Sequence, residues 1–211
     1  MFNVQCSMKI ILSLVFSFCC IFSAVAQREA IDEICQASVR ISTLQADFTQ
    51  AKKMKMLSDV MVSRGKMWCT QPNLLRWEYQ SPQPSSFILN NGKVLLSKGQ
   101  HDRIVNVNRN KMLRQITRLM MPDGLGKCLT EEKDFQVSVQ SENAQHILTL
   151  LPQSKELKQL FTRLVLNYDR KQSVVTKIKM YEKGGDSSVI ELTNIKTNQT
   201  IDESTYSLNR K

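Results

Sequence analysis

Apolar and polar side chains alternate over most of the chain, which is the pattern of half-buried strands. Turn residues separate the alternating segments at intervals of about 8 to 12 residues, and the connections are too short for parallel crossovers. The pattern therefore predicts antiparallel strands arranged as a barrel or sandwich. The predicted strands cover residues 45–53, 60–70, 74–79, 87–89, 94–96, 104–107, 135–139, 146–151, 161–168, 174–181 and 188–195.

Two other segments have the spacing of amphipathic helices. Ala30–Thr43 places apolar residues at helical intervals, and its first turn is acidic, as the helix dipole favours. Met112–Met121 predicts a second helix in the middle of the chain, ended by Pro122. Residues 125–129 predict a further helical turn, and Tyr206–Leu208 is strand-like.

The first 26 residues have the pattern of a secretory signal peptide. Lys9 precedes the apolar run Ile10–Phe22, and Ala24-Val25-Ala26 is an A-x-A site that predicts cleavage after Ala26. The run is shorter than the roughly 20 apolar residues that span a bilayer. Retention as an anchor is the alternative. Residues 27–211 contain no repeat or long linker, so we expect one exported domain.

Six cysteines suggest a disulfide framework until the signal peptide is removed. Cys6, Cys19 and Cys20 lie within it, which leaves Cys35, Cys69 and Cys128. These three could include one disulfide, bind a metal with histidine, or pack as small apolar residues. The domain therefore depends on an apolar core.

The formal net charge of +10 raises the question of an acidic partner. Basic residues cluster at residues 52–55 and 103–118, without the interleaved aromatic residues that stack on bases. An exported protein also rarely meets nucleic acid, so we set it aside as a partner. A solvated basic face and contact with anionic lipid headgroups both fit the clusters.

Motifs of catalysis and cofactor binding are missing from the sequence. It has no Gly-rich phosphate loop, G-x-S-x-G, H-E-x-x-H or C-x-x-C, and its only histidines are His101 and His146. We therefore predict no catalytic residue, cofactor or metal. A secreted hydrolase assembled from distant residues remains open and would need one of the two histidines.

The most specific stretch is Arg64–Leu96. It contains Gly65-Lys-Met-Trp68, then Pro72-Asn-Leu-Leu75-Arg76-Trp77, then Phe87-Ile-Leu89 and the hairpin turn Asn91-Gly92-Lys93. Large apolar residues occupy many alternate positions, which suits either a closed core or the wall of a pocket. The stretch resembles the outer-membrane lipoprotein carrier family, the LolA-type periplasmic chaperones, whose opening also resembles Leu44–Gln50.

The resemblance implies a half-open antiparallel β-barrel of ten or eleven strands, with an N-terminal helix and a central helical lid over an apolar cavity. Such a protein would act in the periplasm as a monomer and make no chemical change. It would take acylated lipoprotein from an inner-membrane ABC transporter and pass it to an outer-membrane acceptor, with transient membrane contact. A carrier of another acylated lipid and an envelope-stress sensor with a membrane partner are the alternatives.

The resemblance also suggests which residues form the site. The predicted cavity wall consists of Phe48, Trp68, Leu75, Trp77, Phe87 and Leu89, with the lid underside Met112, Ile116, Leu119 and Met120. The family often has a basic residue before the motif proline, credited with holding the lid shut. That position is Gln71 here, and Arg76 is predicted to share the latch.

Overall fold

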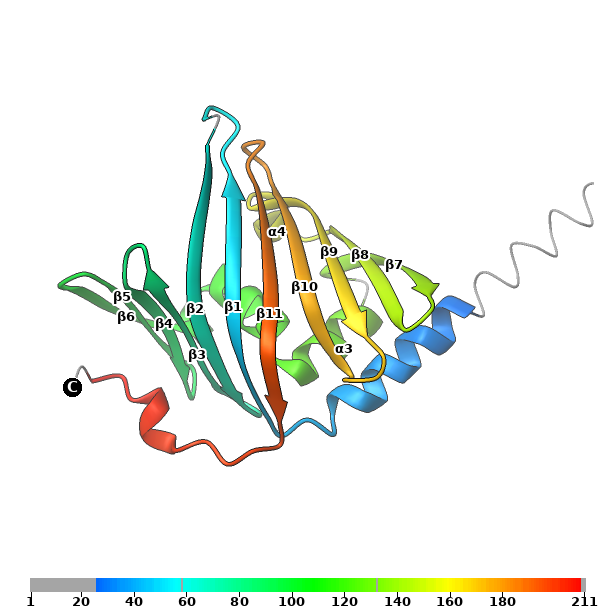
Figure 1. Cartoon of the computed structure of the whole chain (residues 1–211), viewed down its shortest axis with the longest axis horizontal. Coiled ribbons are helices and arrows are strands. Elements are labelled where there is room, and N and C mark those ends of the chain that lie inside the picture. Colours follow the sequence, from blue (N-terminus) through cyan, green and yellow to red (C-terminus); the bar gives the residue numbers. More distant parts are fainter. Residues whose placement is uncertain (1–25, 58, 132, 210–211) are drawn as a thin grey trace, which may run out of the picture.

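The protein is described by a computed structural model covering residues 26–57, 59–131 and 133–209. The predicted signal peptide lies outside the described residues except for Ala26. The described residues form one antiparallel sheet of eleven strands in the order β6-β5-β4-β3-β2-β1-β11-β10-β9-β8-β7, with helices on one side (Figure 1). Because β6 and β7 stand at opposite edges of this sheet, the barrel is only half formed. The predicted fold class is confirmed.

The observed strands match the predicted segments closely. They are β1 (Thr43–Lys53), β2 (Val60–Thr70), β3 (Leu74–Ser81), β4 (Ser85–Asn90), β5 (Lys93–Lys98), β6 (His101–Asn106), β7 (Phe135–Glu142), β8 (Gln145–Pro152), β9 (Phe161–Asp169), β10 (Val174–Glu182) and β11 (Ser187–Thr197). Sequential strands pair within β1–β6 and within β7–β11, and β1 and β11 join the two halves in the middle of the sheet.

The N-terminal helix, described over residues 26–38, ends before the predicted boundary at Thr43. Thr43 already pairs with Thr70 in the sheet, so the intervening residues must turn the chain. Ile41 continues the helical spacing in sequence, but it is buried against the sheet core instead. The prediction was wrong here because an apolar residue in a turn extended the periodic pattern.

The remaining helices interrupt the sheet at two places. Between β6 and β7 lie the 3-10 turn η1 (Val107–Arg109), α2 (Lys111–Met120) and α3 (Pro122–Thr130); α4 (Lys155–Lys158) precedes β9. Asn110 caps α2 by accepting a hydrogen bond from the Leu113 N–H at 3.0 Å.

The strand-like stretch Tyr206–Leu208 forms no strand: Tyr206 ends the 3-10 turn η2 (Glu203–Tyr206), and Ser207 and Leu208 are irregular. Tyr206 is buried with Ile88 and Leu95, and Trp68 packs against them. These strand residues alternate with members of the larger cluster around β1 to β5, so they lie on the opposite, convex face of the sheet. The larger apolar clusters lie on the concave side, one around β1 to β5 and one between β7 to β9 and the helices.

The three described cysteines are free thiols. Burial raises the pKa of Cys69 to about 12 and that of Cys128 to about 11, so both stay protonated at neutral pH. They pack as small apolar residues in the two concave clusters.

Glu33 fastens the N-terminal helix to the sheet. Its carboxylate accepts hydrogen bonds from Arg170 at 3.1 and 2.9 Å and lies 3.3 Å from His146 Nε2. The other His146 nitrogen bonds the Ser141 hydroxyl at 2.9 Å. Hydrogen bonding to Arg170 is the main reason why the pKa of Glu33 lies below its ordinary value of 4.5.

Gly65 marks the closest approach within the sheet. A Cβ atom at this position would collide with the Glu78 carbonyl oxygen and would lie 2.6 Å from the Phe48 ring. The Phe48 ring in turn stacks on Trp77 with 4.4 Å between ring centroids. Glycine at position 65 is therefore needed for Phe48 and Trp77 to pack where they do.

We predict that Gly65→Ala lowers the free energy of unfolding by about 1 to 3 kcal/mol, the usual cost of overpacking. Urea unfolding followed by tryptophan fluorescence measures it. Gly184→Ala is the control, because a Cβ there meets nothing within 4 Å. Equal unfolding midpoints for the two variants would contradict the prediction.

A second prediction concerns pH. Because the folded pKa of Glu33 is lowered, its contribution to stability is present above its ordinary pKa and is lost as pH falls through the folded value. Glu33→Gln should therefore lower the urea midpoint at about pH 7, and the difference from wild type should shrink below about pH 4. Glu29→Gln, an exposed change on the same helix, should have little effect at either pH. A pH-independent difference for Glu33→Gln would refute this account.

Candidate functional site

A cavity of about 420 Å³ lies between the concave face of the sheet and the helices. Its walls are almost entirely apolar and come from both halves of the sheet, from α2 and α3, and from the end of the N-terminal helix. The sheet contributes Met67, Trp77, Tyr79, Phe87, Leu164, Leu166, Ile178, Met180, Ile190 and Leu192, among others. This volume is in the usual range for small-molecule binding sites.

Five of the ten predicted wall residues line this cavity. Trp77 and Phe87 are cross-strand partners on β3 and β4, so their side chains share one face. Ile116, Leu119 and Met120 reach the cavity from α2. These three side chains are only half-buried, although they are the apolar face of the helix.

Three other predicted wall residues lie behind the cavity surface rather than on it. Phe48, Leu75 and Leu89 are buried in the concave core, and they are not among the lining residues. Phe48 supports the wall directly, because its ring stacks on Trp77 and meets Tyr79 edge-on. Met112 is half-buried on α2 but does not line the cavity either.

Trp68 is on the other face of the sheet. Met67 and Cys69, its neighbours in β2, are the buried concave residues, so strand alternation turns Trp68 toward the convex cluster around Tyr206. The motif suggested that Trp68 and Trp77 shared a face. They do not, and Met67 takes the place expected for Trp68 in the cavity wall.

The half of the wall built by β9, β10 and β11 was not predicted from the sequence. Leu164, Leu166 and Tyr168 alternate on β9, and Ile178 and Met180 alternate on β10. These residues alternate in the sequence as strand residues do, but the family motif covers only strands of the first half of the sheet.

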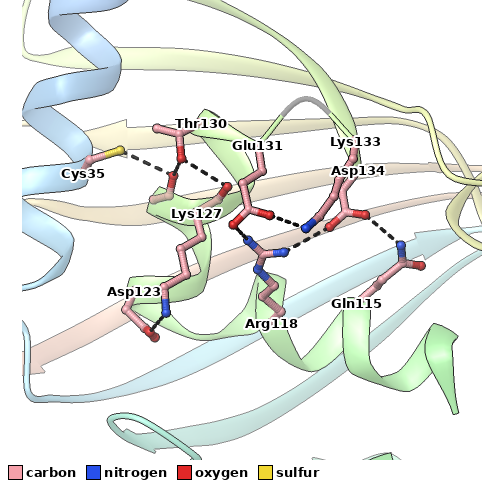
Figure 2. Close-up of polar contacts among 10 residues, drawn as sticks. Cys35, Gln115, Arg118, Asp123, Lys127, Thr130, Glu131, Lys133 and Asp134 are labelled. Atoms are coloured by element: carbon pink, nitrogen blue, oxygen red, sulfur yellow. Dashed lines mark hydrogen bonds and ion pairs between the residues drawn. The ribbon is translucent and has the colours of Figure 1, made fainter. Parts of the chain in front are cut away.

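Helix α2 buries two of its polar residues. Gln115 and Thr117 are buried, and the Gln115 side-chain amide donates to Asp134 at 2.8 Å and to the Ser154 hydroxyl at 3.0 Å. Figure 2 shows Gln115 and Arg118 on either side of Asp134. These bonds fix the side of α2 that faces away from the cavity.

Arg118 joins α2 to the segment between α3 and β7. Its guanidinium lies 2.6 Å from Glu131 and 3.4 Å from Asp134 (Figure 2). Lys133 and Arg118 together lower the pKa of Glu131 to about 2, so the carboxylate is charged at neutral pH. Helix α2 is therefore held by polar bonds to the segments outside the sheet on one side, while its apolar residues face the cavity on the other.

Gln71 and Arg76, the predicted latch residues, are placed differently. The Gln71 side-chain amide donates to the carbonyl oxygen of Ser38 at 3.0 Å. Ser38 is the last residue of the N-terminal helix. Arg76 bonds Glu78 and the Thr205 carbonyl oxygen, so it contacts the C-terminal segment and not the helices over the cavity. Its predicted share in the latch does not fit this geometry.

Polar side chains border the cavity near the β1–β2 hairpin. The Tyr79 hydroxyl donates to Gln50 at 2.6 Å, and Gln50 donates to Ser188 at 3.4 Å. Two residues after Gln50 on β1, the Lys52 ammonium group donates to the Glu182 carboxylate at 2.9 Å. The concave face therefore changes from apolar to polar at this end.

Within the described part of the chain, no group of three or more His, Cys, Asp or Glu residues is placed to hold a metal ion. The helices of that part are all too short or too polar to cross a bilayer. Ser141, His146 and Glu33 form a hydrogen-bonded series of the kind that hydrolases use. Here Arg170 binds the carboxylate, and none of the three residues lines the apolar cavity.

Solved structures with the same fold are known at very low sequence identity. An uncharacterized conserved protein from Thermus thermophilus aligns with a TM-score of 0.51 and 10% identity, covering 85% of this chain and 91% of that one. The Pseudomonas aeruginosa MucA/MucB complex aligns at 0.50 and 13%, covering 83% of this chain and 58% of that one. These likenesses concern the fold alone.

Sequence comparison is more specific. The outer-membrane lipoprotein carrier protein of Legionella pneumophila (strain Lens) is 26% identical over 190 residues, covering 90% of each chain. The protein of the same name from Azotobacter vinelandii is 23% identical, covering 87% of this chain and 85% of its own. The family model for outer membrane lipoprotein carrier protein LolA matches residues 40–209. The chain therefore belongs to the LolA family.

Proposed function

We propose that this protein is a periplasmic carrier that binds the acyl chains of lipoproteins in its apolar cavity and moves them from the inner to the outer membrane. The observation that carries the proposal is the cavity itself, about 420 Å³ in volume and lined from both halves of the sheet and from α2. Membership of the LolA family supports the choice of an acylated lipoprotein as cargo.

The energetics of this cavity suit a reversible carrier. Each methylene moved from water into an apolar site gains about 0.8 kcal/mol, and no bond needs to be made or broken. Ile116, Leu119 and Met120 keep accessible apolar surface that a bound chain would cover. Methionine adapts to different chain shapes, because it is unbranched and flexible.

The polar border gives the ligand an orientation. Acyl chains would fill the apolar interior, while the polar part of the lipoprotein would lie near Tyr79, Gln50 and Lys52. We assign Trp77, Phe87, Ile116, Leu119 and Met120 to direct contact with the ligand. Phe48, Leu75 and Leu89 would act by supporting that wall.

Gln71 would act as a latch between the sheet and the helices. Its bond to Ser38 holds the end of the N-terminal helix, and Ser38 itself lines the cavity. A neutral amide gives a weaker bond than a charged arginine would, so the latch should open easily. An inner-membrane ABC transporter as donor and an outer-membrane acceptor complete the proposed pathway.

Replacement of a lining residue by a charged one tests the cavity as the binding site. We predict that Ile116→Glu weakens uptake of a fluorescent fatty acid at least ten-fold, because a carboxylate in an apolar cavity is costly. Ile104→Glu is the matched control, since Ile104 is 56% exposed and lies outside the cavity. Circular dichroism and thermal unfolding check that both variants fold.

Lipid bound to the protein purified from the periplasm provides the second readout of this experiment. Mass spectrometry should find acylated lipoprotein with wild type and Ile104→Glu, and much less with Ile116→Glu. A non-lipoprotein acyl lipid in its place would favour the alternative carrier. Equal uptake by a folded Ile116→Glu variant would show that the cavity is not the site.

The latch gives a kinetic prediction. Gln71→Ala should release bound fluorescent fatty acid about five-fold faster, as expected for loss of one neutral hydrogen bond. Gln71→Arg keeps a donor at this position and should release it no faster than wild type. Stopped-flow competition measures both rates, and unchanged release from Gln71→Ala would mean that this bond does not limit opening.

A further inference from the structure

The hairpin between β1 and β2 ends in exposed apolar side chains. We call Met56, Leu57, Val60, Met61 and Val62 the β1–β2 tip; their exposed fractions are 93%, 52%, 50%, 46% and 43%. Figure 1 shows this hairpin (cyan to teal) at one end of the sheet, reaching beyond the neighbouring β3. Five large apolar side chains gathered at one exposed place usually mark an interaction site.

The pairing of β2 explains why both faces of the tip are open. Val60 and Val62 pair with Lys53 and Ala51 of β1, but β3 joins β2 only from Arg64 onward. Successive residues of a strand point to opposite faces, and Val60, Met61 and Val62 are all exposed. Neither face of the tip is therefore buried in a core. Exposed strand edges in natural proteins normally carry charged residues that prevent aggregation.

Basic residues surround the tip. Lys53, Lys55 and Arg64 are exposed beside it, as is Lys183 in the turn between β10 and β11. The Gly185 backbone of that turn approaches the Lys55 side chain, so the two hairpins lie together.

The acidic residues near the tip are mostly engaged. Glu182 and Asp186 contact Lys52 at 2.9 and 3.5 Å, and Asp186 also accepts the Lys55 backbone N–H. Asp59 is an exposed carboxylate within the tip. The surface around the apolar side chains is therefore predominantly positive.

We propose that the β1–β2 tip docks the protein on an anionic phospholipid bilayer. Met56 and Leu57 would enter the headgroup region, and the surrounding lysines would contact lipid phosphates. A bilayer fits both halves of the pattern, since it offers an apolar layer beneath a negatively charged surface. The tip is separate from the cavity, so this proposal goes beyond the proposed function and stands without it.

The position of the tip relates it to the cavity. Ile190 of the cavity wall pairs with Gln50, three residues before Lys53 on β1. At about 3.3 Å per strand residue, the wall begins roughly 10 Å from the base of the tip. Docking would thus bring the polar border of the cavity near the lipid surface, where an acyl chain would enter or leave.

The test uses the exported protein, purified from the periplasm, and sedimentation with two kinds of vesicle. One is phosphatidylcholine alone and the other an equal mixture of phosphatidylcholine and phosphatidylglycerol. Wild type should bind the anionic vesicles more tightly, and added salt should weaken binding. The double variant Met56→Ser/Leu57→Ser should bind at least ten-fold more weakly. Ile104→Ser, a change on β6 at an apolar residue about as exposed as Leu57, should bind like wild type.

The lysines provide an independent variant. Lys53→Gln/Lys55→Gln should lose about five-fold in affinity per lysine for anionic vesicles. Fluorescent fatty acid uptake should be unchanged in both double variants, which separates docking from cavity binding. The proposal is overturned if wild type does not bind anionic vesicles, or if Met56→Ser/Leu57→Ser binds them as tightly as Ile104→Ser does. It is also overturned if light scattering shows that the tip joins two copies of the chain instead.

Discussion

The structure depends on a mismatch between the apolar face of the sheet and the helices available to cover it. Eleven strands with period-two alternation place apolar side chains on one concave face, and burying that face is the main source of stability. The helices cover the β7–β8 side closely, whereas between α2 and the strands from β9 to β4 a cavity of about 420 Å³ remains. Unburied apolar surface costs stability, so its persistence here needs a reason, and the acyl ligand that we propose would provide one.

The same constraint explains the unusual attachment of α2. If its apolar residues bound the sheet tightly, the cavity would close and little space would remain for a ligand. The helix is held instead by polar bonds on its other side, from Arg118 and Gln115 to Asp134 (Figure 2). Polar bonds of modest strength at one edge allow the apolar side to separate and return, which a reversible carrier requires.

The sequence predicted the strands and the fold class because alternation is a local signal that tertiary contacts reinforce. It placed the site less well. Trp68 and Trp77 belong to one motif, yet the turn between β2 and β3 puts them on opposite faces of the sheet. Leu75 and Leu89 could not be distinguished from lining residues, since the alternation in a sequence shows which face a side chain is on but not whether it reaches the cavity surface. The exposed tip was not predicted either, because the apolar run Val60–Val62 resembles a buried strand in sequence.

Photocrosslinking in living bacteria tests the central claim most directly. A photoreactive amino acid would replace Phe87, which lines the cavity, or Trp68, which lies on the convex face. We predict that the probe at position 87 crosslinks to acylated lipoprotein in the periplasm and that the probe at position 68 does not. Equal crosslinking at both positions, or none at position 87 in a folded protein, would contradict the account.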